Sequence, residues 1–204
     1  MPNKRVVVWE DEDNISYKET DENGKEIEFT THTLNYMLKS SGIPKNCWEA
    51  KMDFGSAICK KLQRLEEGMG IVLSGTYGCG KTWGIYAWTI QQIKNGKNVI
   101  CKEANAFYME LKTDEWREKF DKYKKIPILV IDDLGIEYDP QSGYFQSLMD
   151  DLINYRYVNK LTTVITTNLP MEKFKERYGG RIIDRLRDWS GYFESKDKSF
   201  RGQK

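Results

Sequence analysis

Gly75-Thr76-Tyr77-Gly78-Cys79-Gly80-Lys81-Thr82 is the stretch that decides the fold of this chain. It matches the phosphate-loop pattern GxxxxGK(S/T). The apolar run 70–74 comes directly before it, and residues 81–94, whose apolar positions have helical spacing, come directly after. A glycine-rich turn that fits the pattern by chance is the alternative, but it does not account for a flanking strand and helix.

The chemistry of such a loop follows from its backbone. Glycines let the chain curl until successive N–H groups point at a phosphate, and the following helix presents its positive end to the same anion. In this arrangement Lys81 would reach the β- and γ-phosphates, and the Thr82 hydroxyl would coordinate Mg²⁺.

A second apolar run ends in two carboxylates. Ile128-Leu-Val-Ile131 is followed by Asp132 and Asp133. A buried parallel strand that ends in acids places them at the edge of an open sheet where ligands bind. Asp132 would then hold the Mg²⁺ shell, and Asp133 would orient or deprotonate the attacking water. A solvated acidic turn is the alternative, and it fits poorly directly after a core strand.

A third β-rich run, Thr162 to Thr167, ends at Asn168. The Asn168 amide can both donate and accept, which suits the positioning of a water beside the γ-phosphate. Taken alone, an asparagine before Leu-Pro is typical of a turn. Its place after this strand favours the functional interpretation.

Short apolar runs alternate with amphipathic segments along most of the chain. We predict strands at 70–74, 98–103, 126–132 and 162–167, and single helices at 50–67, 81–94, 143–160, 171–178 and 180–188, with more than one helix within 105–122. This alternation is the pattern of a parallel sheet with crossover helices, so we predict an α/β fold. Near the amino terminus, Asn23-Gly24 between two β-forming runs is typical of a hairpin.

Composition excludes several classes of protein. The 204 residues are 39% hydrophobic and 31% charged, as expected for one globular domain or one domain with an appendage. No apolar run approaches the roughly 20 residues of a membrane span, and the run near residue 6 is too short for the apolar core of a secretory signal, so we expect a cytoplasmic protein. The spacing of the four cysteines fits neither a zinc site nor a disulfide framework. Residues 1–41 carry a net charge of −4 and the rest +5, so any nucleic acid would contact the larger part.

Further segments make a family resemblance specific. They are Ile131-Asp-Asp-Leu-Gly135, Asn154-Tyr-Arg-Tyr157 followed by Thr166-Thr-Asn-Leu169, and Gly180-Arg-Ile-Ile-Asp-Arg-Leu-Arg187. With the phosphate loop, they are similar to the AAA+ ATPase domain of replicative-helicase loaders of the DnaC/DnaI type and of IstB-type transposition helpers. The resemblance implies a P-loop NTPase fold of the AAA+ type over 41–204, with ATP and Mg²⁺ as ligands. Residues 1–40 remain an acidic segment that either binds a partner or is flexible.

The resemblance also assigns roles to matching residues. Residues 75–82 and Trp83 contact the nucleotide, and Asn168 is the sensor of the γ-phosphate. Arg181 and Arg185 occupy the positions of an arginine finger that acts across subunits, and the resemblance does not choose between them. A solvated helix face paired with neighbouring acids is the alternative for these arginines. Arg201 matches a second sensor, although the chain ends soon after it and we expect little or no C-terminal helical lid.

The function implied by the resemblance is a slow, assembly-dependent ATPase. It would bind single-stranded DNA, self-associate through the arginine finger, and load or remodel a replicative helicase. The segment Lys119-Phe-Asp-Lys-Tyr-Lys-Lys125 alternates lysines with aromatic residues. This pattern is typical of a site that binds single-stranded DNA and equally of the basic end of a helix. Two alternatives stay open, an IstB-like transposition helper and a nucleotide-gated adaptor with negligible turnover.

Overall fold

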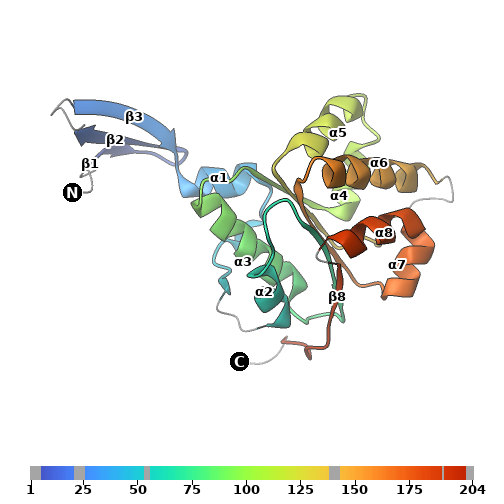
Figure 1. Ribbon diagram of the computed structural model, residues 1–204. Helices are drawn as coiled ribbons and strands as arrows, with labels where there is room; N and C mark the ends of the chain where they lie inside the picture. Colours follow the sequence, from blue (N-terminus) through green and yellow to red (C-terminus); the bar gives the residue numbers. More distant parts are fainter. Residues whose placement is uncertain (1–5, 21–25, 53–55, 138–142, 190, 201–204) are drawn as a thin grey trace.

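The computed structural model describes residues 6–20, 26–52, 56–137, 143–189 and 191–200. Within these ranges the chain forms two sheets, one of three strands and one of five (Figure 1). No helix in the described ranges is both long enough and apolar enough to cross a membrane.

The five-stranded sheet is entirely parallel, with the order β5-β6-β7-β4-β8. Its strands are β4 (Gly70–Gly75), β5 (Val99–Glu103), β6 (Ile128–Asp132), β7 (Thr162–Thr167) and β8 (Tyr192–Ser195). Strand β4 pairs with β7 on one side and β8 on the other, so the loop that follows β4 starts from the sheet interior. The predicted α/β fold with a parallel sheet is confirmed.

Helices cover both faces of this sheet (Figure 1). One face packs against α1 (Leu34–Ser40), α2 (Ala57–Leu62) and α3 (Lys81–Lys94), together with the short 3-10 helix Lys45–Cys47. The other packs against α4 (Ala104–Glu110), α5 (Trp116–Lys125), α6 (Tyr144–Val158), α7 (Met171–Tyr178) and α8 (Gly180–Asp188). Each face buries its own apolar core, so both faces of the central strands are excluded from water. All four cysteines are buried and unpaired, as the sequence predicted.

One predicted element was wrong, and one strand of the main sheet was missed. The helix expected over 50–67 is only α2, because the Ser56 hydroxyl accepts a hydrogen bond from the Cys59 N–H and caps a helix that begins at Ala57. Strand β8 was not predicted, because its four residues form no apolar run. It is held by parallel pairing with β4, an interaction that local sequence does not encode.

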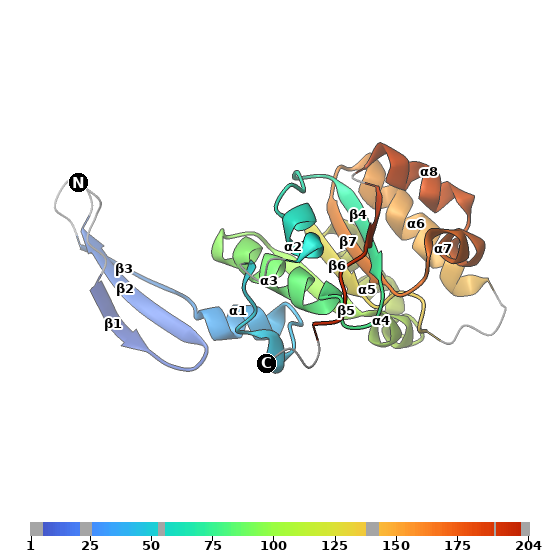
Figure 2. The same cartoon turned by 90° about the horizontal axis from the view of Figure 1, so that it is seen from below.

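The amino-terminal residues form a separate antiparallel sheet. Strands β1 (Val6–Glu10), β2 (Asn14–Thr20) and β3 (Glu26–His32) pair in chain order. Figure 2 shows this sheet standing away from the main body, to which α1 connects it. The runs expected to form a hairpin lie in β2 and β3, whereas the predicted turn at Asn23-Gly24 lies outside the described residues.

A fully buried arginine joins the amino-terminal ends of β6 and β7 to α5. Arg156 of α6 donates to the carbonyls of Tyr123, Ile126 and Thr162 at 2.8, 2.8 and 2.6 Å, and to the Thr163 hydroxyl at 2.8 Å. It forms no ion pair in the described part of the chain, so backbone carbonyls and the Thr163 hydroxyl compensate its charge. The guanidinium thereby ties α5, β6 and β7 together.

Replacing Arg156 should therefore destabilise the fold strongly. We expect Arg156→Met to cost about 3 kcal/mol or more, since buried carbonyls lose their donors. That loss corresponds to a fall in Tm of roughly 6–12 °C for a chain of this size. Arg156→Lys should recover only part of it, because one ammonium cannot reproduce a planar fork. Calorimetry beside the exposed control Arg64→Met tests this, and equal Tm values for the three variants would contradict it.

Candidate functional site

The phosphate loop adopts a conformation that requires its glycines. Gly75, Gly78 and Gly80 have φ values of 155°, 82° and 89°, in the region that L side chains rarely adopt. A Cβ at Gly75 would also lie 2.7 Å from the Cys79 sulfur. Gly80 is left-handed and directly precedes α3, so the loop delivers the chain to the N-terminus of this helix.

Lys81 is buried at the start of α3 and aims its ammonium into the loop. Its Nζ donates to the carbonyls of Gly75 and Thr76 at 2.7 and 3.1 Å, and to Oδ1 of Asn168 at 2.8 Å. All three acceptors are neutral oxygens, so no carboxylate in this set neutralises the lysine charge. An ammonium at the N-terminus of a helix, directly after a glycine-rich loop, is suited to an anionic ligand.

Asp132 ends strand β6 as a buried carboxylate. Its Oδ1 accepts a short hydrogen bond from the Thr166 hydroxyl and a longer one, 3.4 Å, from the Thr82 hydroxyl. Burial raises the pKa of Asp132, and the neighbouring Asp133 charge raises it further, although both hydroxyls oppose the shift. An ionised Asp132 therefore costs free energy in the isolated protein, and a cation beside it would recover that cost.

Asp133 has an unusual backbone conformation for a non-glycine residue, with φ of 60°. Its N–H donates to the Thr166 hydroxyl at 2.8 Å, and its Oδ1 accepts from Nδ2 of Asn168 at 2.6 Å. Asn168 therefore stands between two charges, with its carbonyl on the Lys81 ammonium and its amide on the Asp133 carboxylate. This bridge joins the ends of β4, β6 and β7.

A pocket of about 350 Å³ opens beside the loop, a volume within the usual range for small-ligand sites. It is lined by Cys47, Gly78, Gly80, Lys81, Thr82, Trp83 and Phe200. The Phe200 N–H donates to the Gly78 carbonyl at 2.9 Å, which brings residues near the carboxyl end over the loop. Of the aromatics on α3, Tyr86 and Trp88 are buried in the core, whereas Trp83 is half-buried and borders this pocket.

Thr82 and Asp132 supply the oxygen atoms that Mg²⁺ prefers. Their side-chain oxygens lie 3.4 Å apart at the mouth of the loop. Mg²⁺ is usually held by one or two protein oxygens together with water and substrate phosphates. The two residues present therefore fit an ion that is shared with a nucleotide.

The two candidate finger arginines lie apart from this group, on α8. Both contact Asp150 of α6, Arg185 at 2.9 Å and Arg181 at 3.9 Å. The Arg185 side chain is 20% exposed and the Arg181 side chain 83% exposed. Arg185 is thus engaged within its own subunit, and Arg181 projects into solvent. Arg201 lies outside the described residues.

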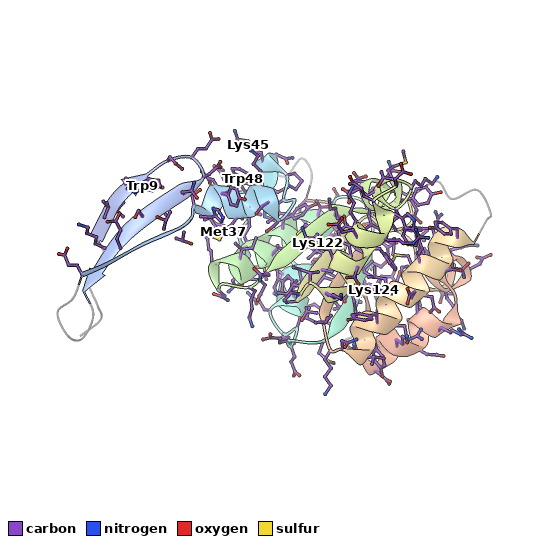
Figure 3. The ribbon with its side chains drawn as sticks, turned by 90° about the horizontal axis from the view of Figure 1, so that it is seen from above. Trp9, Met37, Lys45, Trp48, Lys122 and Lys124 are labelled. Carbon is purple, nitrogen blue, oxygen red and sulfur yellow. The ribbon has the colours of Figure 1, made fainter. Side chains whose placement is uncertain are left out.

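The basic segment 119–125 does not present its aromatics to solvent. Phe120 and Tyr123 are buried in the core under α5, so stacking of bases on them, one of the interpretations of this segment, is wrong. Three lysines form ion pairs, Lys119 with Glu115, Lys124 with Asp151 and Lys125 with Asp121. Figure 3 labels Lys122 and Lys124 on α5, and Lys122 is exposed.

Several residues of the site were missed from the sequence. Thr166 contacts both aspartates, and its position in a Thr-Thr-Asn run was the available signal. No local sequence pattern placed Phe200 or Cys47 beside the loop. Asp150, which holds both arginines, lies on another helix and has no sequence signature.

Comparison with known proteins agrees with this geometry. The profile of the family described as IstB-like ATP binding protein matches residues 56–204. The chain belongs to this family, and it carries a DnaC/IstB-like AAA+ domain. The replicative helicase loader DnaC of Escherichia coli (strain K12) is 27% identical over an alignment of 143 residues, and the match covers 65% of this chain and 57% of the relative. The chain thus spans little more than half the length of this curated relative.

Solved structures share the fold at lower identity. The crystal structure of DnaI has a TM-score of 0.64 at 22% identity, covering 78% of this chain and 95% of that one. The replication initiator DnaA bound to AMPPCP and single-stranded DNA has a TM-score of 0.58 at 20% identity, covering 69% and 44%. The predicted AAA+ fold is therefore confirmed.

The raised pKa of Asp132 has a measurable consequence for stability. A carboxyl whose pKa is higher in the folded state stabilises the fold while protonated, and this contribution is lost as pH rises through the folded pKa. We therefore expect Asp132→Asn to raise the Tm of the nucleotide-free protein by a few degrees at pH 7–8, about 2–4 °C per kcal/mol. The gain should shrink as pH falls through the raised folded pKa of Asp132 and be smallest below the ordinary aspartate pKa of about 3.9.

Thermal unfolding of the two proteins between pH 3.5 and 8 measures this difference. The exposed control Asp114→Asn should change Tm little at any pH. A neutral-pH Tm of Asp132→Asn below that of the parent would contradict the account.

Proposed function

We propose that this chain is an ATP- and Mg²⁺-dependent ATPase that assembles on single-stranded DNA and loads or remodels a replicative helicase. The observation that carries the proposal is the bridge from Lys81 through Asn168 to Asp133, which connects the phosphate loop to the acid strand. The relationship to DnaC, whose name describes it as a replicative helicase loader, supports the choice of process.

Each residue of the site has a separate role in the proposed hydrolysis of ATP. Lys81 and the loop N–H groups bind the phosphates, and Thr82 and Asp132 hold Mg²⁺, which neutralises phosphate charge when bound. Asp133 orients and deprotonates the attacking water, with Asn168 holding its carboxylate in place at 2.6 Å. Asn168 can also exchange its contact with Lys81 for one with the γ-phosphate, as a sensor would.

Hydrolysis also needs a charge from outside the protomer. Arg181 is the better candidate for the finger, because its side chain is 83% exposed while Arg185 is held by Asp150 at 2.9 Å. A guanidinium supplied by a neighbouring copy would stabilise charge on the transferred phosphoryl group. Turnover would then depend on assembly, and DNA that aligns several copies would accelerate it.

The proposal divides the chain into an ATPase domain over 41–204 and a partner-binding segment over 1–40, in which α1 packs on the main sheet and the strands before it carry the partner contact. The three-stranded sheet of this segment stands away from the main body, which suits contact with another protein (Figure 2). Its four consecutive acids, Glu10 to Asp13, are exposed. A basic surface would be the complementary partner.

A second candidate is an IstB-like transposition helper that recruits a transposase to duplex DNA. The family profile favours it, since the match covers residues 56–204. Its distinguishing property is a preference for duplex over single-stranded DNA.

Steady-state ATP turnover with each form of DNA separates these functions. We expect single-stranded DNA to stimulate the parent, and Lys81→Ala and Arg181→Ala each to lower turnover about 100-fold or more, given what phosphate and finger contacts contribute. Equal mixtures of the two variants should recover about a quarter of parental turnover, because an intact loop then meets an intact arginine at one interface in four.

The exposed variant Arg64→Ala serves as the control and should behave like the parent. Stimulation by duplex DNA alone would favour the transposition helper. Binding of ATP without turnover on either DNA would overturn both ATPase functions and leave the nucleotide-gated adaptor.

A further inference from the structure

Glu137 is a carboxylate that the proposed chemistry does not use, and its side chain is completely buried. It lies four positions beyond Asp133, in the segment that follows β6. An ionised side chain at such depth is costly unless several donors compensate it. Its partners therefore indicate what it holds in place.

Those partners come from the end of α7. Arg177 donates to Oε1 of Glu137 through Nη2 at 2.9 Å and through Nε at 3.2 Å, and Nη2 also reaches the Glu137 backbone carbonyl at 2.5 Å. The Tyr178 hydroxyl donates to the same carboxylate oxygen in a short hydrogen bond. Oε2 accepts the Gly135 N–H at 2.8 Å, so both oxygens of Glu137 are satisfied.

This cluster joins two segments that begin at the proposed catalytic residues. On one side the chain runs from Asp133 to Glu137, and on the other it runs from Asn168 directly into α7 (Met171–Tyr178). The helix that follows, α8, carries Arg181 four positions after Arg177 and packs on α7. Glu137 is thus the point where the acid loop contacts the helices that carry the arginines.

The first residues of the acid loop are held against β7 and the segment that follows it. The Leu134 N–H donates to the Thr166 carbonyl at 2.8 Å, and the Thr167 hydroxyl donates to the Leu134 carbonyl at 2.5 Å. A Cβ at Gly135 would lie 2.8 Å from the Leu169 side chain. A displacement of Asp133 or Asn168 would therefore be transmitted to Glu137 rather than absorbed between them.

We propose that Glu137, with Arg177 and Tyr178, is a positioning cluster that couples nucleotide contacts at Asp133 and Asn168 to the placement of α8 and its intersubunit arginine. The inference rests on the proposed roles of Asp133, Asn168 and Arg181. When the Asp133–Asn168 bridge changes its contacts, Glu137 carries the change to Arg177, and α7 and α8 move as one unit. ATP in one protomer thus regulates the arginine that the same protomer offers to its neighbour.

Hydrogen exchange of the full chain tests this coupling without DNA or a helicase. The parent should show slower amide exchange over residues 171–188 with Mg·ATP than without it. Glu137→Gln and Arg177→Gln should lose this response although their ATP affinity stays within about twofold, because neither residue lines the pocket beside the phosphate loop. Arg177 is more than a third exposed, so its variant decides the test if Glu137→Gln does not fold.

A matched control exists on the same face of the sheet. Glu110 accepts from Lys102 at 2.6 Å and from the Tyr123 hydroxyl, so it is also a carboxylate held by a base and a tyrosine. Glu110→Gln should keep the full ATP response over 171–188. If Glu110→Gln also lost the ATP response, the loss in the other variants would reflect lower stability of the fold, and the proposal would be wrong.

Two other results would overturn the proposal. One is an unchanged ATP response in Glu137→Gln or Arg177→Gln, and the other is ATP binding to the parent with no change over 171–188. Parental turnover with DNA is measured separately. Absence of DNA-stimulated turnover would refute the loader function. The hydrogen-exchange result would still show whether the Glu137 cluster couples ATP binding to residues 171–188.

Discussion

The rest of the site depends on the hydrogen-bonded bridge in which the Asn168 amide connects the Lys81 ammonium to the Asp133 carboxylate. The two contacts, 2.8 and 2.6 Å long, join residues that are 87 and 35 positions apart in sequence. A neutral amide between opposite charges keeps the lysine from pairing directly with the aspartate. The lysine therefore remains available to phosphate, and the aspartate to water.

The parallel sheet makes this bridge geometrically possible. Strands β6, β7 and β4 are neighbours in that order, so their carboxyl ends deliver Asp133, Asn168 and the phosphate loop to one edge. Burial on both faces keeps these strands fixed, and Arg156 secures the opposite end of β6 and β7 through backbone carbonyls. Unfavourable free energy is concentrated at the carboxyl ends of the strands, where the Asp132 carboxylate is buried and Asp133 adopts a positive φ.

Local sequence was sufficient for the parts of the fold that local patterns encode. The helix predicted at 81–94 and the strand predicted at 162–167 have those bounds in the structure, because a glycine-rich loop and a β-branched run define them. Strand β8, the Phe200 contact with the loop and the Glu137–Arg177 pair were not predictable in this way. Each depends on partners that are distant in sequence, and the residue types involved are common on protein surfaces. The helix predicted from residue 50 failed because apolar spacing does not identify a cap such as Ser56.

The most direct test of the central claim is single-turnover hydrolysis by Asn168→Ala, measured together with its ATP affinity. The account predicts affinity within about threefold of the parent, because Lys81 keeps its loop contacts, and a chemical step slower by about 100-fold. Asn168→Asp should be at least as slow, since it places a second negative charge beside Asp133. A chemical step in Asn168→Ala as fast as that of the parent would contradict the account.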